Sequence, residues 1–205
     1  MGKPIVAARI AVAVLALAAA IFPFASARAA LVAGNKGQTV YDTTHDATWL
    51  SDANFAATKS FGVKGINPDG SMGWTTAQEW IAAMNAANYL GSSRWSLPTT
   101  KLPDDGCSQN PKSAAFGYFC TGSEMGELYY DGLGGVKGST IQLTHNGSYS
   151  LFKNFQPYLY WSATLWPRVP NSAFSFSFGN GFQGTNVFAN DMYVLPVAPG
   201  KVGSQ

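Results

Sequence analysis

Two carboxylates three residues apart, Glu124 and Glu127, could form an acid–base pair. Side chains at this spacing face the same way on a helix, and glycoside hydrolases use a pair of carboxyl groups in this manner. A simpler interpretation is also open, because Thr121 and Glu124 have the spacing of a helix capping box. We favour this second interpretation, in which Glu124 caps a helix and Glu127 makes a structural hydrogen bond.

The two histidines do not suggest catalysis. His45 lies in the turn sequence THDA and His145 in THNG, and histidines in such loop-like sequence are expected to be solvated. The chain contains no H-E-x-x-H, G-x-S-x-G or phosphate-loop motif. We therefore expect no catalytic residues and a protein that is not an enzyme.

The sequence also offers few acidic residues that could bind a metal. A calcium site needs several oxygen ligands close together, and the tightest acidic candidates are Asp104 with Asp105 and Asn190 with Asp191. The turn NPDG, residues 67–70, lacks the further acids of a calcium loop. Turn formation explains all three stretches, so we expect no bound metal and no cofactor.

The chain has only two cysteines, Cys107 and Cys120, in a stretch rich in Pro, Gly and Ser. In an exported protein such a pair is expected to form a disulfide that closes the loop. A reactive thiol pair is the alternative, but Lys112 is the one basic residue close to either cysteine in sequence. We expect the disulfide.

Flat rings and amide groups gather in two loops near the C-terminus, after YLYWSATLW and after GNGF. Rings stack on sugars or peptides, and amides make directional hydrogen bonds. The alternative is that the rings only pack the loops onto a sheet. The candidate ligand-binding residues are Trp166, Arg168, Asn171, Phe182, Gln183, Asn186, Phe188 and Asn190.

Composition narrows the class of protein. Hydrophobic residues make up 46% of the 205 residues, which is ample for one core, whereas charged residues make up only 12%. Such a surface of Ser, Thr, Asn and Gln is typical of secreted, β-rich proteins. The formal charge of +2 includes three basic residues near the N-terminus, and no basic stripe of a nucleic-acid binder is visible.

Residues 1–30 have the pattern of a signal peptide. A basic start precedes an apolar run from Ile10 to Phe24, and small residues follow at a plausible cleavage site between Ala27 and Ala30. A single anchoring helix is the alternative interpretation. We expect export to the periplasm, the cell surface or the medium, with residues 31–205 as one domain that has no further membrane span.

Two helices and a hairpin are predicted ahead of the last third of the chain. Residues 38–56 resemble a hairpin, and residues 75–91 form the strongest helix pattern, with Thr76 and Glu79 as a capping box and Gly91 as terminator. Its apolar stripe is Ala77, Trp80, Ile81, Met84 and Ala87. A shorter helix is predicted over residues 121–132, ending at Gly132, with its apolar side formed by Met125, Leu128 and Tyr129.

The last third alternates like β-strands that form an antiparallel meander ending in MYVLPVA. Phe174, Phe176 and Phe178 are expected to face the core, and Ser175 and Ser177 to face water. In the neighbouring strand we expect the core face to consist of Leu159, Trp161, Ala163 and Leu165. The opposite face would lie outside, under the polar segment 134–156 or against a ligand: Tyr158, Tyr160, Ser162, Thr164 and Trp166.

Several motifs resemble a known bacterial family, over about Val40 to Gly200. The most specific are WSLPT at residues 95–99, the pair EL at residues 127–128 and YWSAT at residues 160–164. They are similar to the family named for the C-terminal domain of a Legionella collagen-like adhesin. The resemblance implies an exported α+β protein with a C-type lectin-like fold, in which two helices flank a small antiparallel sheet with long irregular loops.

The sequence departs from this family at two positions. Relatives usually carry arginine where this chain has Ser96 and Ala198. If those arginines form structural ion pairs, the two changes are a matched loss. If they line a site for an anionic glycan, this chain is not expected to bind one.

These observations give a leading hypothesis and two alternatives. The leading hypothesis is an exported, non-catalytic adhesion module that recognises a glycan or a surface protein through its C-terminal loops. A self-assembling envelope subunit, and hence an oligomer, is the second interpretation. The third is an enzyme of the distantly similar formylglycine-generating type, which would require free thiols.

Overall fold

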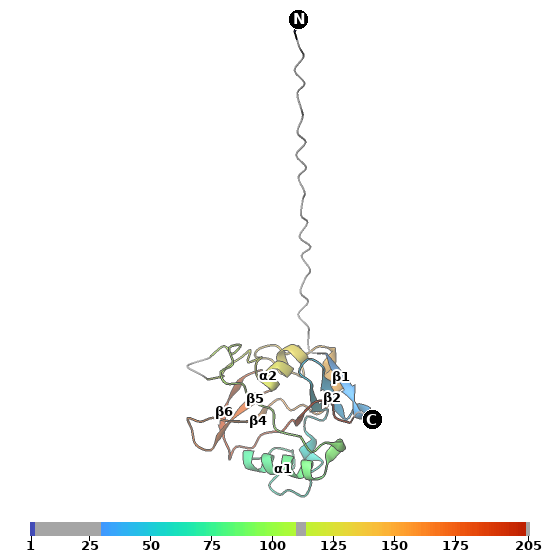
Figure 1. The fold of residues 1–205 in the computed structure, drawn as a ribbon. Coiled ribbons are helices and arrows are strands. Elements are labelled where there is room, and N and C mark those ends of the chain that lie inside the picture. The colour runs from blue at the N-terminus through green and yellow to red at the C-terminus, as the bar shows by residue number, and fades with distance from the viewer. Residues whose placement is uncertain (3–29, 110–113, 204–205) are drawn as a thin grey trace.

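The structure, a computed structural model, describes residues 1–2, 30–109 and 114–203. It contains two antiparallel sheets and two helices, so the α+β expectation is confirmed, with two small sheets where one was expected. In Figure 1 the helices α1 and α2 lie at opposite ends of the ribbon, with strands between them. The expected signal peptide, residues 1–30, lies almost wholly outside the described residues. In the described part of the chain, no helix combines the length and apolar character needed to cross a bilayer.

The first sheet joins the two ends of the described chain. It is built on the expected hairpin of β2 and β3, in which Thr39 pairs with Leu50, and β7 adds to β3 through the pair Trp49 and Val197. In spatial order, its strands are β1 (Leu31–Gly34), β2 (Thr39–Asp42), β3 (Ala47–Leu50) and β7 (Val197–Pro199).

The second sheet differs from the expected meander in its last strand. Its members are β4 (Leu159–Leu165), β5 (Ser172–Ser177) and β6 (Gln183–Val187), in that order. The run MYVLPVA was wrongly placed here, because its strand β7 hydrogen-bonds to β3 in the first sheet. Two isolated bridges, of Tyr193 to Tyr160 and of Val197 to Ser96, tie this run to both halves of the molecule.

Helix α1 (Trp74–Ala86) buries the expected residues Ala77, Trp80, Ile81 and Met84. Its ends differ from the expectation. Thr76 lies inside the first turn and Gly73 occupies the N-cap, so the capping box was wrong. The helix stops before Asn88, which adopts a left-handed φ of 46°, and this leaves Ala87 exposed.

Helix α2 (Glu124–Glu127) continues as a π-helical turn, Leu128–Gly132, and ends at Gly132 as expected. Its predicted apolar side is confirmed, since Met125, Leu128 and Tyr129 are buried. The remaining helical segments are 3₁₀ turns at Asn35–Gly37, Phe55–Ala57, Tyr89–Gly91 and Gly147–Leu151.

Both faces of the central strand β5 are buried, which corrects the expectation of a solvated serine face. Ser175 is fully buried and its hydroxyl accepts a hydrogen bond of 2.9 Å from the Asn186 amide. A buried hydroxyl is tolerated when it is hydrogen-bonded. A serine-lined face can therefore lie against a second packed layer.

The two faces of β4 belong to two different cores. Tyr160 pairs with Phe176 and packs with Phe178, so it lies on the phenylalanine side that was expected to hold Trp161. Trp161 lies in the other core, with Trp80 and Met84 of α1. Ser162 is also buried, whereas Leu165 is exposed. The burial of Trp161 and the exposure of Tyr158 were therefore expected, whereas the expected burial of Leu165 and the expectation that Trp161 shares the phenylalanine face were wrong.

The segment 134–156 covers the Tyr160 face, one of the arrangements expected for it. Ile141, Phe152 and Phe155 from this segment enter the same core as Tyr160. The aromatic and hydroxyl-bearing face of YLYWSATLW is thus mainly a second buried layer.

Candidate functional site

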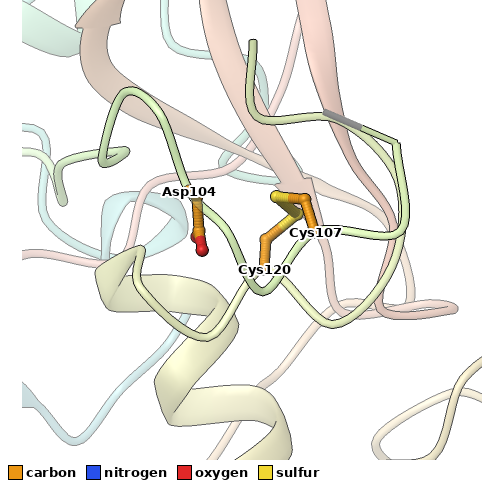
Figure 2. Close-up of side chains that lie close together, drawn as sticks. All are labelled: Asp104, Cys107 and Cys120. Carbon is orange, nitrogen blue, oxygen red and sulfur yellow. A yellow bond between two sulfur atoms is a disulfide. The ribbon is translucent and has the colours of Figure 1, made fainter. Parts of the chain in front are cut away.

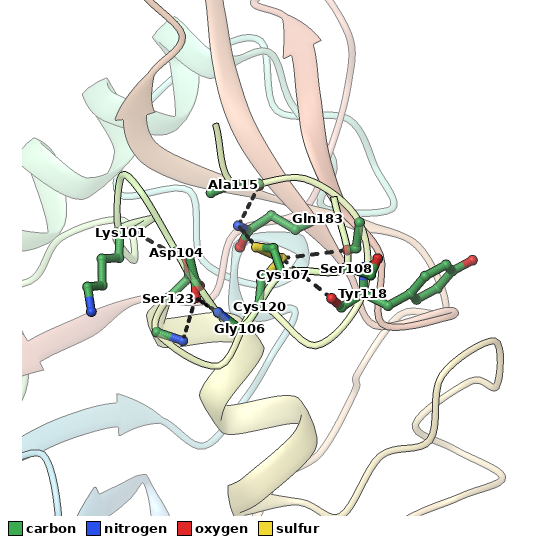
Figure 3. The surroundings of a disulfide bond; sticks show 12 residues. Lys101, Asp104, Gly106, Cys107, Ser108, Ala115, Tyr118, Cys120, Ser123 and Gln183 are labelled. Atoms are coloured by element: carbon green, nitrogen blue, oxygen red, sulfur yellow. Dashed lines mark hydrogen bonds between the residues drawn. A yellow bond between two sulfur atoms is a disulfide. The ribbon is translucent and has the colours of Figure 1, made fainter. Parts of the chain in front are cut away.

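The two cysteines form the expected disulfide, Cys107–Cys120, which is drawn with its surroundings in Figure 3. The bonded loop lies against β6, where Gly117 bridges to Gln183. The Gln183 amide donates a 2.8 Å hydrogen bond to the Ala115 carbonyl. The disulfide closes the loop, and the contacts with Gln183 fix it to the second sheet.

Asp104 lies beside the disulfide, as Figure 2 shows. Its buried carboxylate accepts hydrogen bonds from the Gly106 and Gly122 amides and from the Ser123 hydroxyl, at 2.8–3.2 Å. The disulfide leaves neither cysteine a thiolate with which to bind a metal. Asp104 thus organises a turn, as the sequence predicted.

The predicted ligand-binding residues fall into two groups. Phe182 and Gln183 lie where β6 begins, and Gln183 is buried, so it is not part of an accessible surface. The other members, Trp166, Arg168, Asn171, Asn186, Phe188 and Asn190, lie at or beyond the opposite end of the sheet. Backbone pairing places them there, since Asn186 pairs with Ala173 and the Phe188 amide donates to the Asn171 carbonyl.

At this end of the sheet, three aliphatic side chains are about half exposed: Leu165 at 51%, Val169 at 45% and Val187 at 47%. Trp166 beside them packs edge-on against Phe116 and Phe174, and the Arg168 guanidinium lies 5.3 Å from its ring centre. We name this region the loop surface and define it as Leu165, Trp166, Arg168, Val169, Asn171 and Val187.

Two of the nearby candidates make contacts within the protein. The Phe188 ring stacks on Trp74 with centroids 4.4 Å apart, and Asn186 donates to Ser175 while it accepts from Asn190. These residues hold the loops in place. Ligand binding at the loop surface stays a prediction.

The two histidines have different surroundings. His145 is exposed and stacks on Tyr149, which agrees with a solvated residue. The side chain of His45 is 49% exposed, but its Nδ1 lies 2.9 Å from Asp42 Oδ2 and 3.6 Å from Glu127 Oε2. The expectation that His45 is merely solvated was wrong, because the turn holds it against two buried carboxylates.

The two glutamates also differ from their expected roles. Glu124 does not close a capping box with Thr121, because Ser123 occupies the N-cap of α2. The Glu124 carboxylate instead accepts a 2.8 Å hydrogen bond from the Thr99 hydroxyl. Glu127 is buried and its carboxylate lies 3.6 Å from His45 Nδ1, so an ionisable contact stands where a structural hydrogen bond was expected.

These groups surround a cavity of about 230 Å³ between the β2–β3 hairpin and α2. Trp49 forms part of its wall and is only 2% exposed. Its indole Nε1 has no hydrogen-bond partner among the residues that the structure describes. We name this cavity the His45 pocket; its lining residues are Asp42, His45, Ala47, Trp49, Thr121, Gly122, Ser123, Glu124 and Glu127.

The electrostatics of the His45 pocket set it apart from an ordinary surface ion pair. Burial raises the pKa of Glu127 to about 7, although the positive charge of His45 acts in the opposite direction. Burial also disfavours protonated His45, but the hydrogen bond to Asp42 and the charge of Glu127 outweigh it and raise the pKa of His45. The pocket therefore brings together two ionisable groups whose pKa values are both raised and which influence one another.

A second cavity adjoins the first and shares His45, Ala47 and Glu124 with it. Ser96 and Ala198 both line this cavity. They are thus neighbours in space, although the sequence separates them widely.

Comparison with known proteins gives no match to a family model, a curated protein or a solved structure.

Proposed function

We propose that the protein is an exported, non-catalytic binding module with a C-type lectin-like fold, which recognises a glycan or a protein through the loop surface. The observation that carries the proposal is the set of half-exposed aliphatic side chains Leu165, Val169 and Val187 at the end of the sheet that also carries Trp166 and Arg168. Exposed aliphatic side chains at one end of a sheet offer apolar area for contact with a partner. The disulfide and two antiparallel sheets agree with an exported α+β protein.

The arrangement of the loop surface suits recognition. Phe116 and Phe174 hold the Trp166 ring from one side, so the ring is ordered before a ligand arrives. A preordered ring loses little conformational entropy on binding. Arg168 and Asn171 add polar groups to the loop surface, where directional hydrogen bonds select one ligand over another.

An array of glycans and matrix proteins tests this proposal. The probe is the purified chain. It is compared with the variants Val169→Asp and Val187→Asp, which place a charge on the loop surface without altering buried residues. Leu143→Asp is the matched control, because Leu143 is exposed on another segment. Selective binding that both loop variants lose and the control retains supports the proposal. Binding that all three variants retain contradicts it.

The exposed aliphatic side chains of the loop surface also fit the second candidate function, self-assembly into an envelope structure. Leu165 and Val187 lie on β4 and β6, which are the edge strands of the second sheet. Exposed edges can pair with another copy of the chain. Light scattering over a range of concentrations separates the candidates, since assembly predicts oligomers that Val187→Asp dissolves.

A further inference from the structure

The His45 pocket has features that neither adhesion nor self-assembly explains. It holds three ligand-type groups on two separate elements: Asp42 and His45 on the hairpin and Glu127 on α2. One ligand atom from each of the three lies within 4.8 Å of the others. We propose that this pocket binds a divalent cation of the zinc type through Asp42, His45 and Glu127.

The distances fit such an ion. Ligand atoms that each lie about 2.1 Å from a metal are about 3.0–3.4 Å apart when the angle between them is 90–109°. His45 Nδ1 lies 2.9 Å from Asp42 Oδ2 and 3.6 Å from Glu127 Oε2, which brackets this range. The two distances from His45 are therefore compatible with a shared ion, and all three ligand atoms lie within 4.8 Å of one another.

The pocket holds one of these ligands in place by hydrogen bonds. Asp42 Oδ1 accepts from the backbone amides of Thr44 and His45, at 2.8 and 3.2 Å, which leaves Oδ2 directed to the site. Outer hydrogen bonds of this kind orient metal ligands in proteins. Asp42 is therefore fixed in position by its own turn.

Trp49 provides an independent indication that the pocket has an occupant. Its Nε1–H is a buried donor without a partner among the described residues, and leaving such a group unpaired is unfavourable. An organic ammonium group would satisfy the carboxylates but would offer Trp49 only more donors. A hydrated metal ion supplies both a positive charge and a bound oxygen that can accept from the indole.

The mixture of ligands selects the kind of metal. Calcium and magnesium are bound almost wholly by oxygen, whereas an imidazole nitrogen suits zinc and its neighbours in the transition series. Three protein ligands also leave a coordination position for water. The proposed site therefore binds Zn²⁺ in preference to Ca²⁺, and it does so independently of the loop surface.

Isothermal titration of the metal-free full chain, without a histidine tag, with Zn²⁺ tests the proposal. We expect one equivalent to bind, and His45→Gln and Glu127→Gln each to weaken the affinity by more than about tenfold. His145→Gln is the matched control, because it removes the other histidine, which lies outside the pocket, and it should bind as the unaltered chain does.

Two results would overturn the proposal. One is the absence of stoichiometric Zn²⁺ binding, or a preference for Ca²⁺. The other is equal binding by the His45→Gln and His145→Gln variants, which would indicate adventitious contact with surface histidines. A second measurement does not depend on the variants: the indole N–H resonance of Trp49 should shift with one equivalent of Zn²⁺, and an unchanged resonance would contradict the role of Trp49.

Discussion

The loop surface and the His45 pocket are built in opposite ways. The loop surface consists of one loop and two strand ends, and it exposes apolar side chains to water. The His45 pocket joins a hairpin turn to a distant helix and buries carboxylates around one imidazole. The loop surface favours contact with a partner through its exposed apolar area. The His45 pocket favours contact through the charges of its side chains.

The two regions are also held in place by different kinds of contact. Trp166 is held by rings from β5 and from the disulfide loop, so packing determines its position. His45 is held by Asp42, whose carboxylate is fixed by backbone amides of the same turn. Hydrogen bonds are directional and packing is not. The pocket should therefore be the more sensitive region to small changes in geometry.

The disulfide is the element that links the two regions. Phe116 in its loop supports Trp166, and Thr121 directly after Cys120 lines the pocket. We expect the double variant Cys107→Ala, Cys120→Ala to unfold with a free energy lower by about 3 kcal/mol, because the open loop regains entropy in the unfolded chain. Urea denaturation followed by circular dichroism measures this loss.

Reduction of the unaltered chain is the control for this prediction, since it opens the same loop without changing a side chain. Both treatments should lower the midpoint similarly. Equal stability of the oxidised and reduced chains would mean that the two regions do not depend on the crosslink.

Trp166→Ala tests whether the loop surface is held by packing. The ring makes edge-on contacts to Phe116 and Phe174, so we expect a loss of about 2 kcal/mol in unfolding free energy. Trp166→Phe keeps an aromatic ring and should lose less than half as much. A Trp166→Ala chain as stable as the original would show that the ring serves only the ligand.

Local patterns predicted much of this fold. The hairpin, the buried stripe of α1 and the end of α2 at Gly132 follow from periodicity and from glycine, which act over a few residues. The disulfide followed from there being only two cysteines. Each of these features depends on residues that are near one another in the sequence.

Features that depend on tertiary packing were missed. Ser175 has the pattern of a solvent-facing residue, and only the position of Asn186 shows that its hydroxyl is hydrogen-bonded in the interior. The sequence did not predict the His45 pocket, for the same reason. Asp42, His45 and Trp49 belong to one hairpin, but Glu127 joins them only when α2 packs on it.

Glu127→Gln tests the buried charge of the pocket. The folded-state pKa of Glu127, about 7, lies above its ordinary value of 4.5, so the neutral form favours folding. This contribution is complete below about pH 4.5 and is lost as the pH rises through 7. The raised pKa of His45 acts in the same direction, because its contribution is also lost as the pH rises.

We therefore expect Glu127→Gln to unfold like the original chain at pH 4.5 and to be more stable at pH 8 by about 1–2 kcal/mol, a value reduced for solvent screening. Thermal unfolding at the two pH values measures this. Glu79→Gln removes the same charge from the exposed face of α1 and is the matched control. A gain at pH 8 that both variants share would assign the effect to net charge and not to the pocket.

Arg168→Ala gives the smallest expected change in stability and the sharpest contrast with Trp166. The guanidinium lies 5.3 Å from the Trp166 ring centre at an exposed position, where a cation–π contact contributes about 0.5–1 kcal/mol. Lys137→Ala removes a similar contact, 4.7 Å from the Tyr118 ring centre, away from the loop surface. Both variants should unfold within about 1 kcal/mol of the original chain in urea, but only Arg168→Ala should weaken binding of a ligand found on the array. If Arg168→Ala instead destabilises the chain as much as Trp166→Ala does, the guanidinium is part of the packed scaffold, and recognition must depend on the aliphatic side chains alone.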